Sequence, residues 1–161
     1  GKEFDITPYG TEAMHVLRAE KGFIIVGQET DGSTTPVDLD MNWIVSKKKY
    51  DFIGKRALSR SDTLKENRKQ LVGLLTDDPN EILEEGAQLV ENETTLPMIM
   101  VGHVTSSYYS PNLKRSFALA LIKGGINKKG LKLLAPMQRK TIEVKITSPV
   151  FIDPSNERLN T

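Results

Sequence analysis

The sequence predicts an α+β protein in which a helix-rich N-terminal part is followed by a small antiparallel β-barrel. Three observations support this. An amphipathic helical pattern lies near the start of the chain, the pattern changes to short β-rich runs from Lys69 onward, and turn residues separate those runs at fairly regular spacing. Such spacing is typical of an antiparallel sandwich or barrel. We therefore divide the chain into residues 1–68 and residues 69–161.

The first predicted element is a helix that begins near Thr11 and ends at Gly22. Thr11 can cap its first turn, Glu12 is placed favourably for the helix dipole, and Gly22 is a natural C-terminal cap. One side of this helix is apolar because hydrophobic residues recur at helical spacing: Ala13, Met14, Leu17 and, more marginally, Val16. That side requires a partner surface.

The rest of residues 1–68 offers little to cover the helix. We expect a short strand at 23–26, a helical turn ending at Leu39, an extended segment at 43–45 with Trp43 in the core, a solvated lysine loop at 47–49 and a polar helix at 57–67. These elements are too few to bury the apolar side of the first helix. Another part of the same polypeptide, or another subunit, is expected to cover it; the isolated chain is otherwise expected to expose an apolar patch and to be able to form a homodimer.

Six strands are predicted in residues 69–161, which is enough to close a small barrel. They are expected at 70–76, 87–91, 98–108, 116–122, 131–134 and 141–146. The segments between them carry residues suited to turns, such as Asp77-Asp78-Pro79-Asn80 and Ser110-Pro111-Asn112.

The composition excludes several classes of function. Lysine and arginine number 22 against 21 acidic residues, so the charge gives no field that would gather nucleic acid or a membrane surface. The chain has no cysteine and only two histidines, which argues against a metal site and suits a reducing, cytoplasmic compartment. The start, Gly1-Lys2-Glu3, is expected to be an internal point of a longer protein.

Several ordered motifs resemble the aminomethyltransferase family, which includes the glycine-cleavage T-proteins. The segments that carry the resemblance are Leu17-Arg18-x-Glu20-x-Gly22, Gly27-Gln28-Glu29-Thr30-Asp31, Asp51-Phe52-Ile53-Gly54-Lys55 and Gly102-His103-Val104-Thr105-Ser106. The resemblance implies that residues 1–68 are the C-terminal part of a ferredoxin-like, folate-binding domain. It also implies that residues 69–161 are the barrel domain of that family.

Within this family the chain is more similar to the alpha subunits of heterotetrameric sarcosine oxidases than to T-proteins. The Arg-Asp pair of the family's helix is replaced by Met14-His15, which makes transfer from a lipoyl carrier doubtful. The resemblance implies oxidative demethylation of sarcosine to glycine, with tetrahydrofolate bound in this region and flavin and NAD elsewhere in the complex. The partners implied are the rest of the alpha subunit and the other subunits, and the isolated fragment is expected to be inactive.

The site residues implied by the resemblance are a carboxylate that holds the pterin and polar neighbours around it. Glu20 or Glu12 is the candidate carboxylate, and Gln28 and Tyr108 are candidate hydrogen-bonding or stacking neighbours. The two carboxylates have plainer alternatives, since Glu20 can form a surface ion pair with Arg18 or Lys21 and Glu12 can act only on the helix dipole. No catalytic residue is assigned.

Two other classes of function stay open at this point. The chain can be a stand-alone, non-catalytic module that binds folate or a partner, or an architectural piece whose barrel only supports an interface. Binding of tetrahydrofolate by this chain would argue against the architectural reading.

Overall fold

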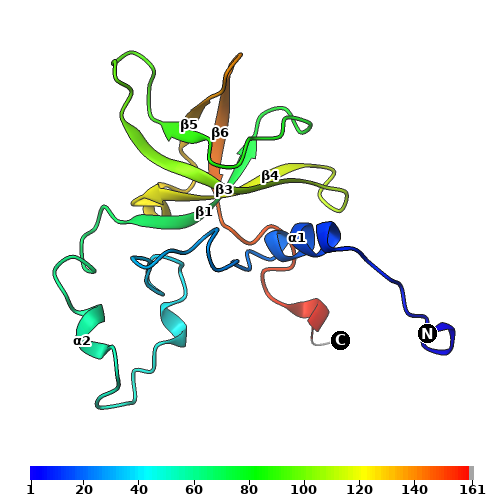
Figure 1. Ribbon diagram of the computed structural model, residues 1–161, viewed down its shortest axis with the longest axis horizontal. Coiled ribbons are helices and arrows are strands. Elements are labelled where there is room, and N and C mark those ends of the chain that lie inside the picture. Colours follow the sequence, from blue (N-terminus) through cyan, green and yellow to red (C-terminus); the bar gives the residue numbers. More distant parts are fainter. Residues whose placement is uncertain (160–161) are drawn as a thin grey trace.

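A computed structural model describes residues 1–159 and shows a β-barrel with the N-terminal part lying along one side of it (Figure 1). The helices are α1 (Thr11–Glu20) and α2 (Lys55–Leu58), with 3-10 turns at Lys2–Phe4, Asn42–Ile44, Gly125–Lys128 and Glu157–Leu159. The strands are β1 (Lys69–Thr76), β2 (Gln88–Val90), β3 (Met100–Ser110), β4 (Arg115–Lys123), β5 (Lys132–Pro136) and β6 (Thr141–Thr147). No helix in the described part of the chain has the length and apolarity needed to cross a bilayer.

The strands form a closed barrel in the order β1-β4-β3-β2-β5-β6, and every neighbouring pair is antiparallel. The prediction of a six-stranded antiparallel barrel is therefore confirmed. Closure leaves no unpaired sheet edge. Alternate side chains fill the interior, and the largest contributors include Leu74, Leu89, Ile122, Val144 and Ile146.

Strand β4 is buried on both of its faces, because the N-terminal part covers the outside of the barrel there. Seven consecutive residues from Ser116 to Ile122 are buried. The outward-facing residues belong to a second apolar cluster that includes Ala19 of α1, Leu39, Leu71, Phe117 and Leu119. Phe151 packs edge-on against Phe117, with 4.8 Å between the ring centroids. The segment after β6 thus contributes to the packing of the N-terminal part against the barrel.

A β-bulge in β3 changes which residues face outward. Val104 pairs with Ala120 of β4, whereas Ser106 pairs with the next residue, Leu119, so Thr105 is the extra residue. His103 faces outward before the bulge. After the bulge, Ser106 and every second residue from it, such as Tyr108, face outward. If Thr105 were paired regularly instead of bulged, Ser106 would face the same inward side as Val104, because side chains alternate along a strand.

Several predictions for residues 1–68 are wrong in detail. Only residues 57–58 of the expected helix at 57–67 are α-helical, at the end of α2. Side chains compete for the backbone there, since Ser59 donates to Arg56 O and Thr63 donates to Ala57 O. Residues 23–26 form no strand, since the closed barrel offers them no edge; Val26 makes only an isolated bridge.

Two expectations for individual residues are also corrected. The segment at 43–45 is not extended, because Ile44 and Val45 make the short-range backbone bonds of a 3-10 turn, and Trp43 is 80% exposed rather than in the core. The N-cap of α1 is Gly10 rather than Thr11, which is the first helical residue. Gly22 does follow the helix in a left-handed conformation, as expected of a C-terminal glycine.

The apolar side of α1 stays open within this chain. Met14 and Leu17 are 45% and 47% exposed, and Ala13 is exposed too. The helix instead packs on the barrel through Val16 and Ala19. Other large apolar side chains of the N-terminal part are exposed as well: Phe4, Ile6, Tyr9, Phe23, Val26, Trp43, Ile44, Tyr50, Ile53 and Leu64.

Candidate functional site

A buried arginine lies between α1 and the outer face of the barrel. The Arg18 side chain is 10% exposed, and its Nη1 donates to Glu29 Oε2 at 2.9 Å; the Glu29 side chain is fully buried. Arg18 Nη2 lies within hydrogen-bonding distance of Gln28 Oε1 at 3.0 Å, Ser106 Oγ at 2.6 Å and Tyr108 Oη at 3.3 Å. These five residues, which we call the Arg18 cluster, tie the helix, the following loop and β3 together.

The Glu29 carboxylate is fully engaged inside this cluster. Its Oε1 accepts from Ser106 Oγ at 2.5 Å, and its Oε2 accepts from the backbone N–H of Ile25 at 2.7 Å in addition to Arg18. The Tyr108 ring adds a cation–π contact, with 5.8 Å from Arg18 Cζ to the ring centroid. An ion pair with this many hydrogen bonds is compatible with burial, although Arg18 Nε has no partner among residues 1–159, whereas either charge alone is not.

Glu20 has a different set of partners. Its side chain is almost fully buried and accepts from Ser110 Oγ and from Asn112 Nδ2, both at the tip of the β3–β4 hairpin. Its backbone carbonyl accepts from the N–H groups of Phe151 and Ile152. Glu20 is therefore not the surface ion-pair partner of Arg18, and a pterin would have to displace partners that it already holds.

Glu12 lies at the other end of α1. It is exposed in the first turn, about 9 Å along the helix axis from Arg18 at the usual rise per residue. The structure thus brings two of the candidate site residues, Gln28 and Tyr108, together around Arg18. It places Glu12 and Glu20 elsewhere.

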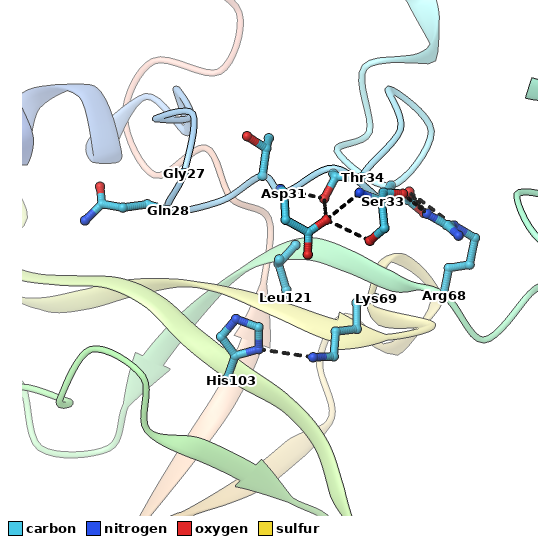
Figure 2. A pocket seen from close by; sticks show the side chains of 11 residues that line it. Gly27, Gln28, Asp31, Ser33, Thr34, Arg68, Lys69, His103 and Leu121 are labelled. Atoms are coloured by element: carbon cyan, nitrogen blue, oxygen red, sulfur yellow. Dashed lines mark hydrogen bonds and ion pairs between the residues drawn. The ribbon is translucent and has the colours of Figure 1, made fainter. Parts of the chain in front are cut away.

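A polar cavity of about 350 Å³ lies beside the Arg18 cluster, between the loop at 27–38 and the outer face of β1, β3 and β4. Figure 2 shows Asp31, Ser33 and Thr34 of the loop on one side, and Lys69, His103 and Leu121 of the barrel on the other. We call this cavity the loop pocket. No group of three or more potential metal ligands is present among residues 1–159.

One end of the loop pocket is closed by a second ion pair. Arg68 donates through Nε to Asp38 Oδ1 at 2.8 Å and through Nη2 to Asp38 Oδ2 at 2.6 Å. The backbone N–H and hydroxyl of Thr35 both donate to Asp38 Oδ2 at 2.8 Å. Burial raises the pKa of Asp38, but these hydrogen bonds outweigh it and hold the pKa below its usual value of 3.8.

We expect Asp38→Asn to lower the free energy of unfolding by about 2 kcal/mol at pH 7, because charge-assisted hydrogen bonds are lost. Since the pKa is lower in the folded state, the carboxylate stabilises the fold above pH 3.8 and loses this effect as the pH falls through the folded-state value. Urea unfolding of the parent chain and of Asp38→Asn between pH 7 and pH 2.5 measures the difference in their free energy of unfolding. A difference that stays constant down to pH 2.5 would show that the charge of Asp38 does not cause the loss of stability.

The comparisons with known proteins agree with this architecture. The model of the glycine cleavage T-protein C-terminal barrel domain matches residues 69–153, which is more than half of the chain, and the GCVT N-terminal domain matches residues 1–49. The chain belongs to the glycine cleavage T-protein family. The resemblance found in the sequence motifs is thereby confirmed, and the family's barrel domain corresponds to the observed β-barrel.

The chain is similar to proteins of two kinds. The alpha subunit of sarcosine oxidase from Corynebacterium sp. (strain P-1) is 54% identical over 98% of this chain, and that from Rhizobium meliloti (strain 1021) is 37% identical over 99%. An aminomethyltransferase from Clostridium botulinum (strain Okra / Type B1) is 33% identical over 89%. The chain spans only 16% of the length of each alpha subunit and 37% of that aminomethyltransferase.

A solved T-protein structure has the same fold. The glycine cleavage system aminomethyltransferase T from Bartonella henselae superposes with a TM-score of 0.74 at 25% identity, covering 89% of this chain and 39% of that structure. The predicted fold class is confirmed by this match together with the closed barrel.

The reasoning from sequence missed several residues of the site. Arg18, Glu29 and Ser106 each stand in motifs that resemble the T-protein family, yet Arg18 and Ser106 are 88 positions apart and nothing in the motifs links them. Lys69 and His103 lie on strands that are not neighbours but flank β4. Only the strand register would have placed these residues next to one another, and the sequence alone does not determine that register.

Proposed function

We propose that this chain is the C-terminal, aminomethyltransferase-like part of a sarcosine oxidase alpha subunit and forms one side of a tetrahydrofolate site. The observation that carries the proposal is the 54% identity with a sarcosine oxidase alpha subunit across 98% of this chain, against 33% for an aminomethyltransferase. Tetrahydrofolate would accept the one-carbon unit released when sarcosine is oxidised to glycine at a flavin outside this chain.

The residues present fit part of such a site. The loop pocket is in the size range of small-ligand cavities, and the adjoining Gln28 and Tyr108 offer a polar group and an aromatic ring. The two buried glutamates near the helix and loop, Glu20 and Glu29, already have hydrogen-bond partners on both carboxylate oxygens. A pterin-holding carboxylate would therefore come from elsewhere, with Glu12 as the exposed candidate of this chain.

The role of this chain in the reaction would be positioning. The amine of tetrahydrofolate is itself the nucleophile, so the protein needs to hold it near the one-carbon unit and to exclude water. The open apolar side of α1, with Met14 and Leu17 about half exposed, supports a site completed by another part of a longer protein.

The test is a titration of tetrahydrofolate against two proteins. One is this chain alone, and the other is the alpha subunit from Corynebacterium sp. (strain P-1) in which this chain replaces the matching segment, assembled with its other subunits. We expect binding at least tenfold tighter in the second protein, and sarcosine-dependent formation of methylenetetrahydrofolate only there. Calorimetry measures the first and product analysis the second.

The outcome distinguishes the proposal from its alternatives. Equal binding by both proteins would favour a stand-alone folate-binding module. A chimera that oxidises sarcosine but binds no tetrahydrofolate would contradict the proposed site and leave only a supporting role for the barrel.

A further inference from the structure

Two cationic or titratable side chains meet on the barrel side of the loop pocket without an acidic partner. Lys69 Nζ lies 3.4 Å from His103 Nδ1 (Figure 2). Both side chains are half-buried, and they come from β1 and β3, the strands on either side of β4. Leu121 of β4 lies between these strands, opposite His103 in the sheet.

The other partly buried cations near α1 and the loop are neutralised, and Lys69 is not. Arg18 is paired with Glu29, Lys21 with Asp153 and Arg68 with Asp38. Within residues 1–159, no carboxylate lies within ion-pair distance of Lys69. A half-buried ammonium group without a counter-charge is unfavourable, so an anion would be stabilised beside it.

The remaining charged groups around the loop pocket leave this position free for an anion. Asp31 of the loop accepts from the backbone N–H and hydroxyl of Ser33, both at 2.7 Å, and from Thr34. Arg68 is held by Asp38 at the end of the cavity. The position opposite His103 on β2 is Gln88, which carries no charge.

We propose that the loop pocket is a binding site for the carboxylate of a small organic acid, held between Lys69 Nζ and the His103 imidazole. Lys69 supplies a permanent charge, and His103 becomes a second charged donor when it takes up a proton. The carboxylate can belong to the glutamyl tail of a folate or to a free acid of low mass. This inference rests only on the residues that line the loop pocket and is independent of the proposed function.

The imidazole makes this binding depend on pH. Burial, and after it the charge of Lys69, lowers the pKa of His103 below 6.5 in the free protein, and Asp31 opposes this shift. A bound carboxylate favours the imidazolium and raises that pKa, so binding and proton uptake are linked. We therefore expect affinity to increase as the pH falls from 7.5 to 5.5.

Nuclear magnetic resonance of the imidazole protons tests the site directly, because the chain has only two histidines and His15→Gln assigns the signals. The probes are glutarate, 5-formyltetrahydrofolate and pteroate, which lacks the glutamyl carboxylates. Glutarate should move the His103 titration to higher pH and should leave the His15 signals in place at any one pH. Lys69→Met, which keeps the aliphatic stem, should weaken glutarate binding about tenfold, and His103→Asn should remove the pH dependence.

The matched control is Lys145→Met, which removes the same charge from an exposed position on β6 and should leave binding unchanged. If 5-formyltetrahydrofolate binds more tightly than pteroate and Lys69→Met removes this difference, the bound carboxylate belongs to the folate tail. If glutarate binds but the two pterins bind equally, the site is supported and its ligand is a free acid. The proposal is overturned if no carboxylate moves the His103 titration, if Lys69→Met and Lys145→Met behave alike, or if chloride at equal ionic strength gives the same shift.

Discussion

Replacing Arg18 with methionine should lower the free energy of unfolding by about 3–5 kcal/mol, the range found when one partner of a buried ion pair is removed. The substitution leaves the carboxylate of Glu29, which is fully buried, without its counter-charge, while Ser106 and the N–H of Ile25 still hold it in place. Urea denaturation at pH 7, followed by tryptophan fluorescence and circular dichroism, measures the loss.

The double variant Arg18→Met/Glu29→Gln distinguishes the effect of the unpaired Glu29 charge from the effect of losing the Arg18 contacts. It should recover a large part of the stability, because the amide can keep the hydrogen bonds without a buried charge. Lys132→Met is the control, since Lys132 pairs with Glu143 on the exposed faces of β5 and β6 and should have a much smaller effect. Equal losses for Arg18→Met and the double variant would contradict the role assigned to the buried charge.

Gly73→Ala should destabilise the protein by about 2–3 kcal/mol through overpacking. A Cβ at this position of β1 would lie 2.3 Å from Ser148 O and 2.6 Å from the Phe151 ring. The backbone of residues 148–151 would therefore have to move away from the barrel. Since Phe151 N–H bonds to Glu20 O and its ring packs on Phe117, this displacement would also loosen α1.

Hydrogen exchange locates the effect of Gly73→Ala. The amides of Phe151 and Ile152 should lose protection, whereas those of β5 should keep it relative to the new global stability. Gly32→Ala is the matched control, because a Cβ there meets no atom within 4 Å and the backbone is outside the left-handed region. A similar loss of stability in both variants would show that contact with residues 148–151 is not the cause.

The barrel was largely predictable from the sequence because its information is local. Turn residues such as Pro111 and Asn112 mark the ends of strands, and β-rich runs fill the intervals, so each of the six strands lies within a few residues of its predicted position. Local patterns do not determine which residues of two strands pair with each other. The proximity of Lys69 to His103, and of Ser106 to Arg18, therefore could not be predicted from them.

The N-terminal part was predicted less well because its conformation depends on distant contacts. The apolar run at 23–26 resembles a strand, but the barrel closes on itself and gives it no strand to pair with. Trp43 was expected in a core on the strength of its size, yet it is exposed, as are many large apolar residues of this part. A surface ion pair of Glu20 with Arg18 or Lys21 was the alternative to a ligand role for Glu20. Instead, Glu20 accepts from Ser110 and Arg18 donates to Ser106.

The extra residue in β3 lets a single strand serve both the loop pocket and the Arg18 cluster on the same outer face. Thr105 lies between His103 of the loop pocket and Ser106 of the Arg18 cluster. In a strand without a bulge, His103 and Ser106 would face opposite sides of the barrel, because they are three positions apart in the sequence and side chains alternate along a strand. Bulge-free pairing of this sequence could therefore keep either the loop-pocket residue or the Arg18-cluster residues of β3 on the outside of the barrel, but not both.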